Sequence, residues 1–579
     1  MRSVALLVVL SIMSVLGCGG KESTGPDIAS VVVTPATATL VSLGETVQLT
    51  ASARNASGDA ISGRTFTWSS SDESIATISV SGLVRAVANG SVTMTATTEG
   101  AEGTAAIEVA QAAAQLAFTV QPTESLVRLQ IRPGVQVAIE DALGNPVRGA
   151  RGSVTVALGA NPSGATLQGM TIETAPDGIA RFNGIAVDRA GVGYTLVASS
   201  PSLPDATSAA FDVITLLLAS VNAGHGHTCG ITTGATTYCW GNNSAGQLGG
   251  GSTKNRSRVP LTVSGGLTFA SLSAGGIHTC AVTTSGTGYC WGFGAQGQLG
   301  GVAPDGCGSL LERCSRTPLA VSGNISFTSI SADRLHTCAV TTSSTAYCWG
   351  QNFRGALGDG TTTERRTPVL VLGGLTFQAV SAGDSYTCGI AIDGGAYCWG
   401  NNGDGQLGDG SLTDRSIPAL VTGGLVWRTV SAVHHTCGIT VDGNAYCWGN
   451  NGQGQLGNGS TGDSDAPTLV SGGLLFTSLS VGGGRSQSGI LTHFTCGVTT
   501  GGSAYCWGFG AALGSGRTNN STVPVAVSGG LTFESVTTGR AHACGVTTDH
   551  ALYCWGANED GQVGDGSSSF RTTPVSIGG

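Results

Sequence analysis

The chain has 579 residues, of which 93 are glycine and 17 are cysteine, and its formal net charge is −9. At about 150 residues per domain, this length predicts several domains, each with its own core. The low charge content and acidic balance exclude a broad basic surface, so we expect no nucleic-acid partner. The cysteine count favours an exported protein with paired cysteines, because reducing compartments keep thiols free.

The chain begins with a candidate export signal. An apolar run over residues 4–16 is too short to span a bilayer but has the length of a signal-peptide core. It ends in Val15-Leu16-Gly17-Cys18, which resembles the lipobox of bacterial lipoproteins. The resemblance implies that residues 1–17 are removed, that Cys18 carries the lipid and that residues 18–27 form a tether. The alternative is an ordinary signal peptide with a chance cysteine.

The residue after the lipobox indicates the destination of the anchor. Gly19 stands there rather than the aspartate that resembles an inner-membrane retention signal. We therefore expect a bacterial protein held in the cell envelope, in the outer membrane or at the cell surface. Whether it faces the periplasm or the exterior stays open.

Two segments follow that predict β-sandwiches. Residues 28–110 alternate short β-branched runs with turns at roughly ten-residue spacing, including one predicted strand over residues 46–51. Thr67-Trp68-Ser69-Ser70-Ser71-Asp72 resembles the bacterial Ig-like group 2 family, which implies that Trp68 is a core aromatic residue. Residues 115–214 repeat this rhythm and resemble related bacterial Ig-like domains. The resemblance implies spacers, with direct adhesion as the alternative.

Residues 215–579 contain seven copies of a cysteine followed ten positions later by Cys-Trp-Gly. The copies are about 50 residues apart, which is typical of four-stranded propeller blades. Cys307 and Cys314 remain in an insertion of the second copy and can close on each other. The seven predicted disulfides join Cys229 and Cys239, Cys280 and Cys290, Cys338 and Cys348, Cys388 and Cys398, Cys437 and Cys447, Cys496 and Cys506, and Cys544 and Cys554.

The fifth copy shows why these cysteines are expected to form disulfides. If Val441-Asp442-Gly443 is a three-residue hairpin loop, Cys437 lies directly opposite Cys447 at near-disulfide distance. The same register places Tyr446 opposite Gly438, and we expect the small residue to make room for the tyrosine ring. Zinc is disfavoured because nine intervening residues do not form a zinc knuckle.

Each copy continues with a motif such as Asn450-Asn451-Gly452-Gln453-Gly454-Gln455-Leu456-Gly457. These copies resemble the regulator of chromosome condensation repeat family, which implies a seven-bladed β-propeller. Fold alone does not carry function. The family's nucleotide-exchange role suits neither an anchor nor an exported address, whereas a secreted bacterial branch that inhibits β-lactamases through propeller loops is a closer analogue.

The residues give no catalytic constellation: we find no nucleophile elbow, phosphate loop or zinc-protease motif. Five histidines share the position two before the first cysteine, but Tyr386 and Phe494 take that position in other copies, which favours a structural role. His434 and His493 lie in the corresponding turns of adjacent copies and could form a metal or pH-sensitive site. Because no carboxylate shares their positions, we predict no metal site, and whether any metal binds stays open. We also expect no cofactor, and Asp409 in a glycine-rich loop is read as a turn rather than a calcium ligand.

Residues outside the repeat pattern are the best candidates for binding. All tryptophans and tyrosines have repeat or core positions, which leaves four phenylalanines and the loop arginines, including those of insertions at 301–314 and 482–491. The candidate binding residues are Phe293, Phe353, Phe509, Phe570, Arg313, Arg334, Arg354, Arg485 and Arg540.

The sequence therefore predicts an all-β, lipid-anchored envelope protein in which two Ig-like domains carry a disulfide-linked propeller. Its expected function is protein binding through propeller loops, with the membrane contacted only through the lipid. A passive structural or adhesive role is the first alternative. A glycan-acting propeller enzyme is the second and requires a carboxylate cluster in the central channel. The ligand, the binding face and the oligomeric state stay open.

Overall fold

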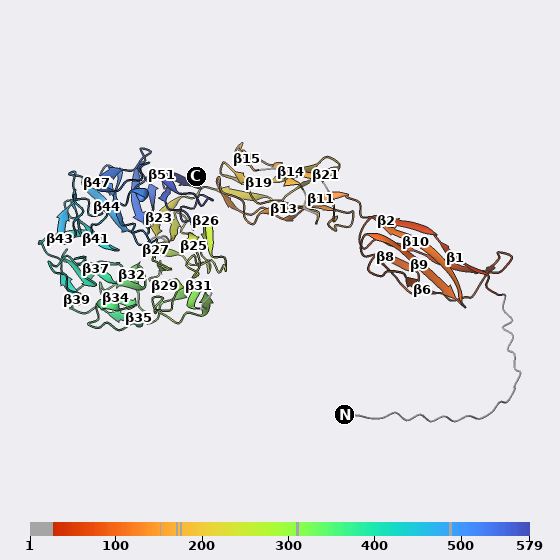
Figure 1. Ribbon diagram of the computed structural model, residues 1–579, viewed down its shortest axis with the longest axis horizontal. Helices are drawn as coiled ribbons and strands as arrows, with labels where there is room; N and C mark the ends of the chain where they lie inside the picture. Colours follow the sequence, from red (N-terminus) through yellow and green to blue (C-terminus); the bar gives the residue numbers. More distant parts are fainter. Residues whose placement is uncertain are drawn as a thin grey trace, which may run out of the picture.

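The computed structural model describes residues 27–150, 152–169, 172–173, 177–307, 312–485 and 489–578. Two elongated sandwiches lie end to end, and the second one meets the edge of a ring of seven sheets (Figure 1). The structure is thus all-β, as predicted. The predicted signal peptide and Cys18 lie outside the described residues. Within the described ranges, no helix combines the length and the apolar character of a membrane span.

The first sandwich contains ten strands in sheets of three, four and three strands. They are β1 (Ser30–Thr34), β2 (Thr37–Leu40), β3 (Thr46–Gln48), β4 (Thr50–Arg54), β5 (Ala60–Ile61), β6 (Thr67–Ser70), β7 (Ala76–Ile78), β8 (Leu83–Ala86), β9 (Gly90–Thr98) and β10 (Ala101–Val109). Along β10, buried and exposed residues alternate, as expected for a strand with one face on the core. The prediction of one strand over residues 46–51 was wrong, because the chain there forms β3 and β4 in different sheets. Trp68 packs on the core but stays partly exposed.

The second sandwich has its own core, in which Val137, Phe182 and Tyr194 are fully buried. Its strands are β11 (Gln115–Val120), β12 (Ser125–Leu126), β13 (Val135–Glu140), β14 (Ser153–Leu158), β15 (Leu167–Gln168), β16 (Ile172–Glu173), β17 (Ile179–Phe182), β18 (Ala186–Val187), β19 (Gly191–Tyr194), β20 (Leu196–Ser200), β21 (Leu203–Thr207) and β22 (Phe211–Ile214). The separate core makes this segment a structural unit of its own.

Both junctions between the three bodies contain buried contacts. Between the sandwiches, Asp141 accepts hydrogen bonds from the Leu43 backbone nitrogen at 2.9 Å and from Gln111 Nε2 at 3.0 Å. Between the second sandwich and the ring, Leu126 and Leu129 join an apolar cluster with Leu216 and other residues of the ring. The sandwiches therefore hold the ring through specific contacts rather than through a bare linker.

The ring is a propeller of seven blades, in each of which the first three strands follow one another from the channel outward; in the second blade β31 comes next and β30 forms the outer edge. The first blades contain β23 (Leu218–Ala223), β24 (His227–Thr232), β25 (Thr237–Asn242), β26 (Arg256–Thr262); β27 (Phe269–Ala274), β28 (His278–Thr283), β29 (Gly288–Phe293), β30 (Asp305–Cys307), β31 (Glu312–Ala320); and β32 (Phe327–Ala332), β33 (His336–Thr341), β34 (Ala346–Gly350), β35 (Arg365–Leu370). The fourth and fifth blades contain β36 (Phe377–Ala382), β37 (Tyr386–Ala391), β38 (Ala396–Gly400), β39 (Arg415–Leu420); and β40 (Trp427–Ala432), β41 (His435–Thr440), β42 (Ala445–Gly449), β43 (Ser464–Leu469). The last blades contain β44 (Phe476–Gly482), β45 (Phe494–Thr499), β46 (Ala504–Gly508), β47 (Ser521–Ala526); and β48 (Phe533–Thr538), β49 (His542–Thr547), β50 (Leu552–Gly556), β51 (Arg571–Ile577). Two short 3-10 helices, η1 (Phe353–Gly355) and η2 (Gly510–Ala512), lie in loops.

Disulfides link the second and third strands of every blade. In the fifth blade Cys437 faces Cys447 in the predicted register, and their Cα atoms are 4.1 Å apart. Cys307 and Cys314 form an eighth disulfide, which links the extra strand β30 to β31 in the second blade. The blade disulfides are those predicted from the spacing: Cys229 with Cys239, Cys280 with Cys290, Cys338 with Cys348, Cys388 with Cys398, Cys437 with Cys447, Cys496 with Cys506, and Cys544 with Cys554.

One predicted contact was wrong. Gly438 does lie opposite Tyr446, but the ring that lies against it belongs to Trp427 of the innermost strand. A Cβ at Gly438 would lie 2.7 Å from Trp427 Cε3. The small residue after the first cysteine therefore makes room for a side chain from the strand before it, which the hairpin register alone does not reveal.

The blades are sealed to one another by the tryptophan of the Cys-Trp-Gly motif. Trp448 is fully buried, and its Nε1 donates to the Gln406 carbonyl of the preceding blade at 3.0 Å. Gly408 lies under this ring with φ +69°, and a Cβ there would come within 2.5 Å of Nε1. Glycine is required at this repeat position because the next blade's tryptophan fills the space of a side chain.

Candidate functional site: the loop face and channel mouth

One face of the propeller carries its long loops. Because strands in a blade alternate in direction, the turn after the innermost strand and the loop after the third strand emerge on the same side. We call this side the loop face. Its described residues near the channel are 224–226, 275–277, 333–335, 383–385, 433–434, 483–485, 489–493 and 539–541, and those farther out are 243–255, 294–307, 351–364, 401–414, 450–463, 509–520 and 557–570. A ligand that approaches the channel from the loop face therefore contacts both the inner turns and the outer loops.

All nine predicted binding residues lie on the loop face or at the strand ends that border it. Phe353 and Phe570 are 59% and 42% exposed, whereas Phe293 and Phe509 are half-buried. Arg334, Arg485 and Arg540 belong to the inner turns, Arg354 belongs to an outer loop, and Arg313 lies at the start of β31, which borders the outer loop. The structure thus brings the nine to one face but divides them between an inner and an outer circle.

Two of the exposed residues form a local pair. The Arg354 guanidinium lies over the Phe353 ring at 5.1 Å from its centroid and also bonds Asp414 Oδ2 of the next blade at 2.7 Å. The arginine therefore fixes the orientation of the aromatic ring, which lowers the entropy that the ring would lose on binding.

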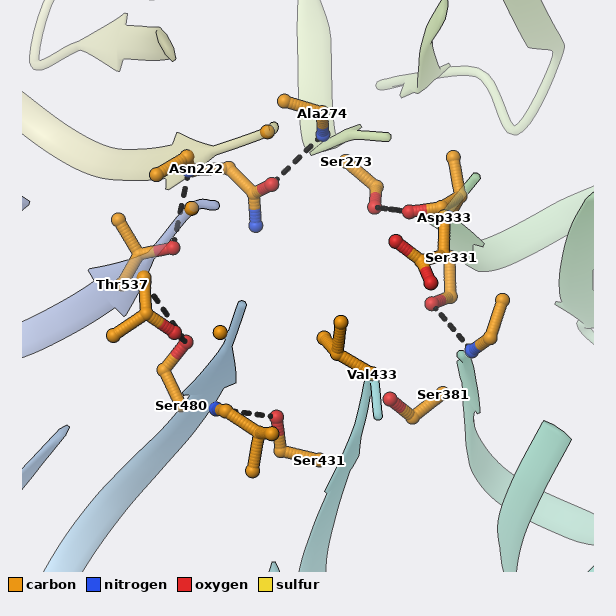
Figure 2. A pocket seen from close by; sticks show the side chains of 18 of the residues that line it. Asn222, Ser273, Ala274, Ser331, Asp333, Ser381, Ser431, Val433, Ser480 and Thr537 are labelled. Atoms are coloured by element: carbon orange, nitrogen blue, oxygen red, sulfur yellow. Dashed lines mark hydrogen bonds between the residues drawn. The ribbon is translucent and has the colours of Figure 1, made fainter. Parts of the chain in front are cut away.

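A ring of hydrogen bonds between neighbouring blades surrounds the mouth of the central channel at this face. In every blade, the polar side chain near the end of the innermost strand accepts from the backbone nitrogen of the next blade, at 2.7–3.1 Å (Figure 2). The acceptors are Asn222, Ser273, Ser331, Ser381, Ser431, Ser480 and Thr537. They line a pocket of about 110 Å³ at the channel mouth.

Charged residues that the sequence analysis missed lie around this pocket. Asp333 Oδ1 is 3.6 Å from His225 Nε2, and Asp384 Oδ2 is 3.0 Å from Arg334 Nη1 and 3.5 Å from His434 Nδ1. The expectation that no carboxylate shares the turns of His434 and His493 was therefore wrong. The sequence did contain a clue to these carboxylates, since both aspartates occupy the turn before the repeated histidine position. Their proximity to the histidines, however, arises only when the ring brings the turns of blades three, four and five together.

His434 and His493 stack with ring centroids 4.4 Å apart. Burial lowers the pKa of His434 to about 4 and that of His493 to about 3, because a buried imidazolium loses its hydration. Both rings are neutral at neutral pH. Among the described residues, no group of three or more His, Cys, Asp and Glu side chains is arranged to hold a metal ion.

The repeated histidines serve the joints between blades. His278 Nε2 is 2.8 Å from Thr337 Oγ1, and this threonine donates to the Gln298 carbonyl at 2.9 Å. Since the hydroxyl hydrogen is used in that bond, the histidine must be the donor and carries its proton on Nε2. Equivalent histidine–threonine or tyrosine–threonine pairs occur at His227, His336, Tyr386, His435 and His542. These positions are structural rather than catalytic in their contacts.

In the glycine-rich loop around Asp409, the carboxylate of this residue is hydrogen-bonded to neighbouring side chains of the same blade. The Asp409 carboxylate accepts from Arg415 Nε at 2.9 Å and from Ser411 Oγ at 2.7 Å. These hydrogen bonds hold the pKa of Asp409 below its usual value in spite of its partial burial. Its oxygens therefore stabilise a turn, in agreement with the sequence interpretation.

Comparison with known proteins identifies a family for the propeller and for the first sandwich. The model of the RCC1-like domain family matches residues 188–490, and that of the regulator of chromosome condensation (RCC1) repeat matches residues 533–562. The model of the bacterial Ig-like domain (group 2) matches residues 27–109.

The chain is 32% identical over 149 residues to the probable E3 ubiquitin-protein ligase HERC6 of Homo sapiens, which covers 25% of this chain and 14% of HERC6. It is 31% identical over 150 residues to the ultraviolet-B receptor UVR8 of Arabidopsis thaliana, covering 26% of this chain and 32% of UVR8. The match thus spans at most about a third of either relative.

Among solved structures, human WBSCR16 superposes with a TM-score of 0.53 at 20% identity, covering 59% of this chain and 94% of that chain. Yeast RCC1 (Prp20), solved with Kap60 bound, gives a TM-score of 0.52 at 20% identity, covering 62% of this chain and 85% of that chain. At this identity the likeness concerns the fold alone. On the family match over more than half of its length, this chain belongs to the RCC1-like domain family.

Proposed function

We propose that this protein is a lipid-anchored component of a bacterial cell envelope whose propeller binds a protein partner through the loop face. The observation that carries the proposal is the position of the nine residues outside the repeat pattern, all of which lie on or border this one face. Aromatic and arginine side chains on loops held by a rigid scaffold are typical of protein-binding surfaces.

The scaffold supports a binding role because it resists deformation. Eight disulfides and the hydrogen bonds between blades hold the loop bases in place, so binding does not have to order the whole face. Among proteins of the same fold, yeast RCC1 (Prp20) was solved with Kap60 bound to it, which supports a protein partner for this chain.

The anchor and the export route are supported by the sequence of the amino terminus and by the disulfides. Paired cysteines suit an oxidising compartment. Two sandwiches in a row would hold the propeller away from the membrane (Figure 1). Replacing Cys18 with alanine should release the protein from the membrane fraction, and continued membrane retention of this variant would overturn the anchor.

Affinity capture tests the binding function. The oxidised full chain on beads is offered native envelope extract, beside two double variants with matched changes. Phe353→Ser/Phe570→Ser changes exposed residues of the loop face, whereas Ile392→Ser/Val441→Ser changes residues that are each 64% exposed in turns on the opposite face.

We expect one partner that is retained by the unchanged chain and the opposite-face variant but lost by the loop-face variant. Equal retention by all three would place binding elsewhere. If nothing is retained beyond empty beads, the passive structural role replaces the binding role.

A further inference from the structure

The pocket at the channel mouth contains a buried carboxylate, one oxygen of which has no hydrogen-bond partner among the described residues. Asp333 lies in the turn after β32, is 6% exposed, and is the acidic residue among those that line the pocket. Figure 2 shows its carboxylate pointing from the wall toward the centre of the channel. A charged group in such a position loses most of its hydration.

The contacts of Asp333 set it apart from other shielded aspartates of the propeller. Its Oδ1 lies 3.6 Å from His225 Nε2, and its buried Oδ2 has no hydrogen-bond partner among the described residues. By contrast, Asp384 pairs with Arg334, and Asp359 pairs with Arg365 through Oδ2 at 2.8 Å. Burial accordingly raises the pKa of Asp333. A buried carboxylate oxygen without a hydrogen-bond partner, in a pocket lined by polar groups, indicates that a ligand binds there.

The surroundings of Asp333 define the chemistry that would satisfy it. Hydroxyl oxygens of Ser331 and Ser381 line the same pocket, and each accepts one backbone hydrogen bond, which leaves a second lone pair. Ala332, Ala382 and Val433 supply small apolar wall beside them. The pocket therefore offers one carboxylate oxygen, several hydroxyl acceptors and a short apolar passage.

We propose that this pocket binds a primary ammonium group carried on an alkyl stem, as in the lysine side chain of a protein partner. The proposal deepens the proposed function, since it names the side chain that a partner on the loop face would insert. An ammonium group is a compact donor of three hydrogen bonds and matches one carboxylate oxygen with neighbouring hydroxyls. A guanidinium group fits less well, because its planar fork needs both carboxylate oxygens and Oδ1 faces His225.

Nearby cations do not oppose this occupant. Arg334 is the neighbouring residue, but its charge is paired with Asp384 at 3.0 Å. Arg485 and Arg540 belong to the sixth and seventh blades, on the far side of the ring from the third blade. His434 and His493 are neutral at neutral pH because burial lowers their pKa values.

The test uses the oxidised full chain and a capped Gly-Lys-Gly peptide, with binding followed by saturation-transfer NMR of the lysine side-chain protons. The comparison ligands are the same peptide with an acetylated lysine, a Gly-Arg-Gly peptide and free cadaverine. The protein variants are Asp333→Asn and, as a matched loss of charge on the opposite face, Asp393→Asn, whose carboxylate lies in the turn between β37 and β38.

We expect the lysine peptide to bind the unchanged chain and Asp393→Asn equally, and Asp333→Asn at least tenfold more weakly. Acetylation should abolish binding, and the arginine peptide should bind at least fivefold more weakly. Cadaverine binding as tight as that of the peptide would assign the site to free amines rather than to a protein side chain, and would overturn the lysine assignment. If Asp333→Asn binds the lysine peptide as tightly as the unchanged chain does, the assignment of the lysine site to this pocket is wrong.

Stability measurements separate a binding role from a structural one. If the carboxylate serves a ligand, Asp333→Asn should have a Tm equal to or above that of the unchanged chain. A lower Tm would mean that the carboxylate stabilises the fold through His225, and would overturn the proposal. Val433→Lys provides a second variant: its ammonium group should enter the pocket from the turn of the fifth blade, raise the Tm and block the lysine peptide.

The outcome is separable from that of the proposed function. If a partner is captured through the loop face but Asp333→Asn captures it equally, the binding function stands and the lysine pocket fails. If no partner is found but the lysine peptide binds in an Asp333-dependent way, the pocket stands and the larger function fails.

Discussion

Six of the seven joints between blades are polar at the histidine position, and the joint between the sixth and seventh blades is apolar. In the polar joints, a histidine or tyrosine bonds a threonine of the next blade, as His278 does with Thr337 at 2.8 Å. In the apolar joint, Phe494 replaces the histidine and Ala543 replaces the threonine, and both are fully buried in one cluster. The two residues that meet at a joint must therefore match each other, either as a hydrogen-bonded polar pair or as an apolar pair. A mismatched pair would leave a buried donor without an acceptor, which costs free energy.

The largest expected loss of stability follows from removing the buried tryptophan, which both kinds of joint contain. Trp448→Ala removes a fully buried ring at a polar joint, and Trp555→Ala does the same at the apolar joint. Each should lower the free energy of unfolding of the propeller by about 3–5 kcal/mol, measured by denaturant titration. Trp68→Phe in the first sandwich is the control and should leave this transition unchanged. A loss below about 1 kcal/mol at either joint would mean that the tryptophan does not hold the blades together.

Disulfides act within blades, so their loss should affect both kinds of joint alike. Cys437→Ala/Cys447→Ala should lower the free energy of unfolding by up to about 3 kcal/mol, because the reduced hairpin gains chain entropy when unfolded. Cys307→Ala/Cys314→Ala is the matched control, since this disulfide lies outside the repeated pair. A larger effect of the control than of the blade disulfide would contradict the assignment of stability to the repeat.

Changing one partner of a polar joint should cost more than changing both. Thr337→Ala leaves His278 Nε2 without its acceptor and should cost about 1–3 kcal/mol of unfolding free energy. The double variant His278→Phe/Thr337→Ala copies the apolar joint and should recover part of that loss. The coupling free energy from the double-mutant cycle is the measurement. Additive losses would show that the two residues act independently.

The last expected effect is a dependence of stability on pH, which is absent at neutral pH and grows as the pH is lowered. Burial lowers the pKa of His278 to about 3 from 6.5, so the unfolded chain binds the extra proton in this interval and the folded chain does not. Stability from this joint is thus complete above about pH 6.5 and falls with decreasing pH by up to about 1.4 kcal/mol per unit.

The variant with the copied apolar joint tests this slope. His278→Phe/Thr337→Ala should show a shallower loss of stability between pH 6.5 and 4 than the unchanged chain, measured from the free energy of unfolding at each pH. Phe494→His/Ala543→Thr should steepen it. Identical slopes in all three proteins would mean that the buried histidines do not control acid unfolding.

Much of the fold could be predicted because it is encoded locally and repeated. The spacing of Cys437 and Cys447 determines a hairpin register, and seven copies of that hairpin predict a propeller. Contacts between blades could not be read in this way. Gly438 was assigned to the tyrosine opposite it, although the ring of Trp427 fills that space, because the innermost strand folds over the hairpin.

The sequence by itself determined the seven repeats, the blade disulfides and the loops that carry Phe353 and Phe570, since these follow from patterns within one repeat. Only the tertiary structure decided that Asp333 lines the pocket at the channel mouth and that Asp384 of the next blade contacts His434 of the blade after it. These residues are about 50 positions apart along the chain, and no local pattern relates their side chains. Closure of the ring places successive turns side by side, and burial at the channel mouth then raises the pKa of Asp333 and lowers that of His434 to about 4.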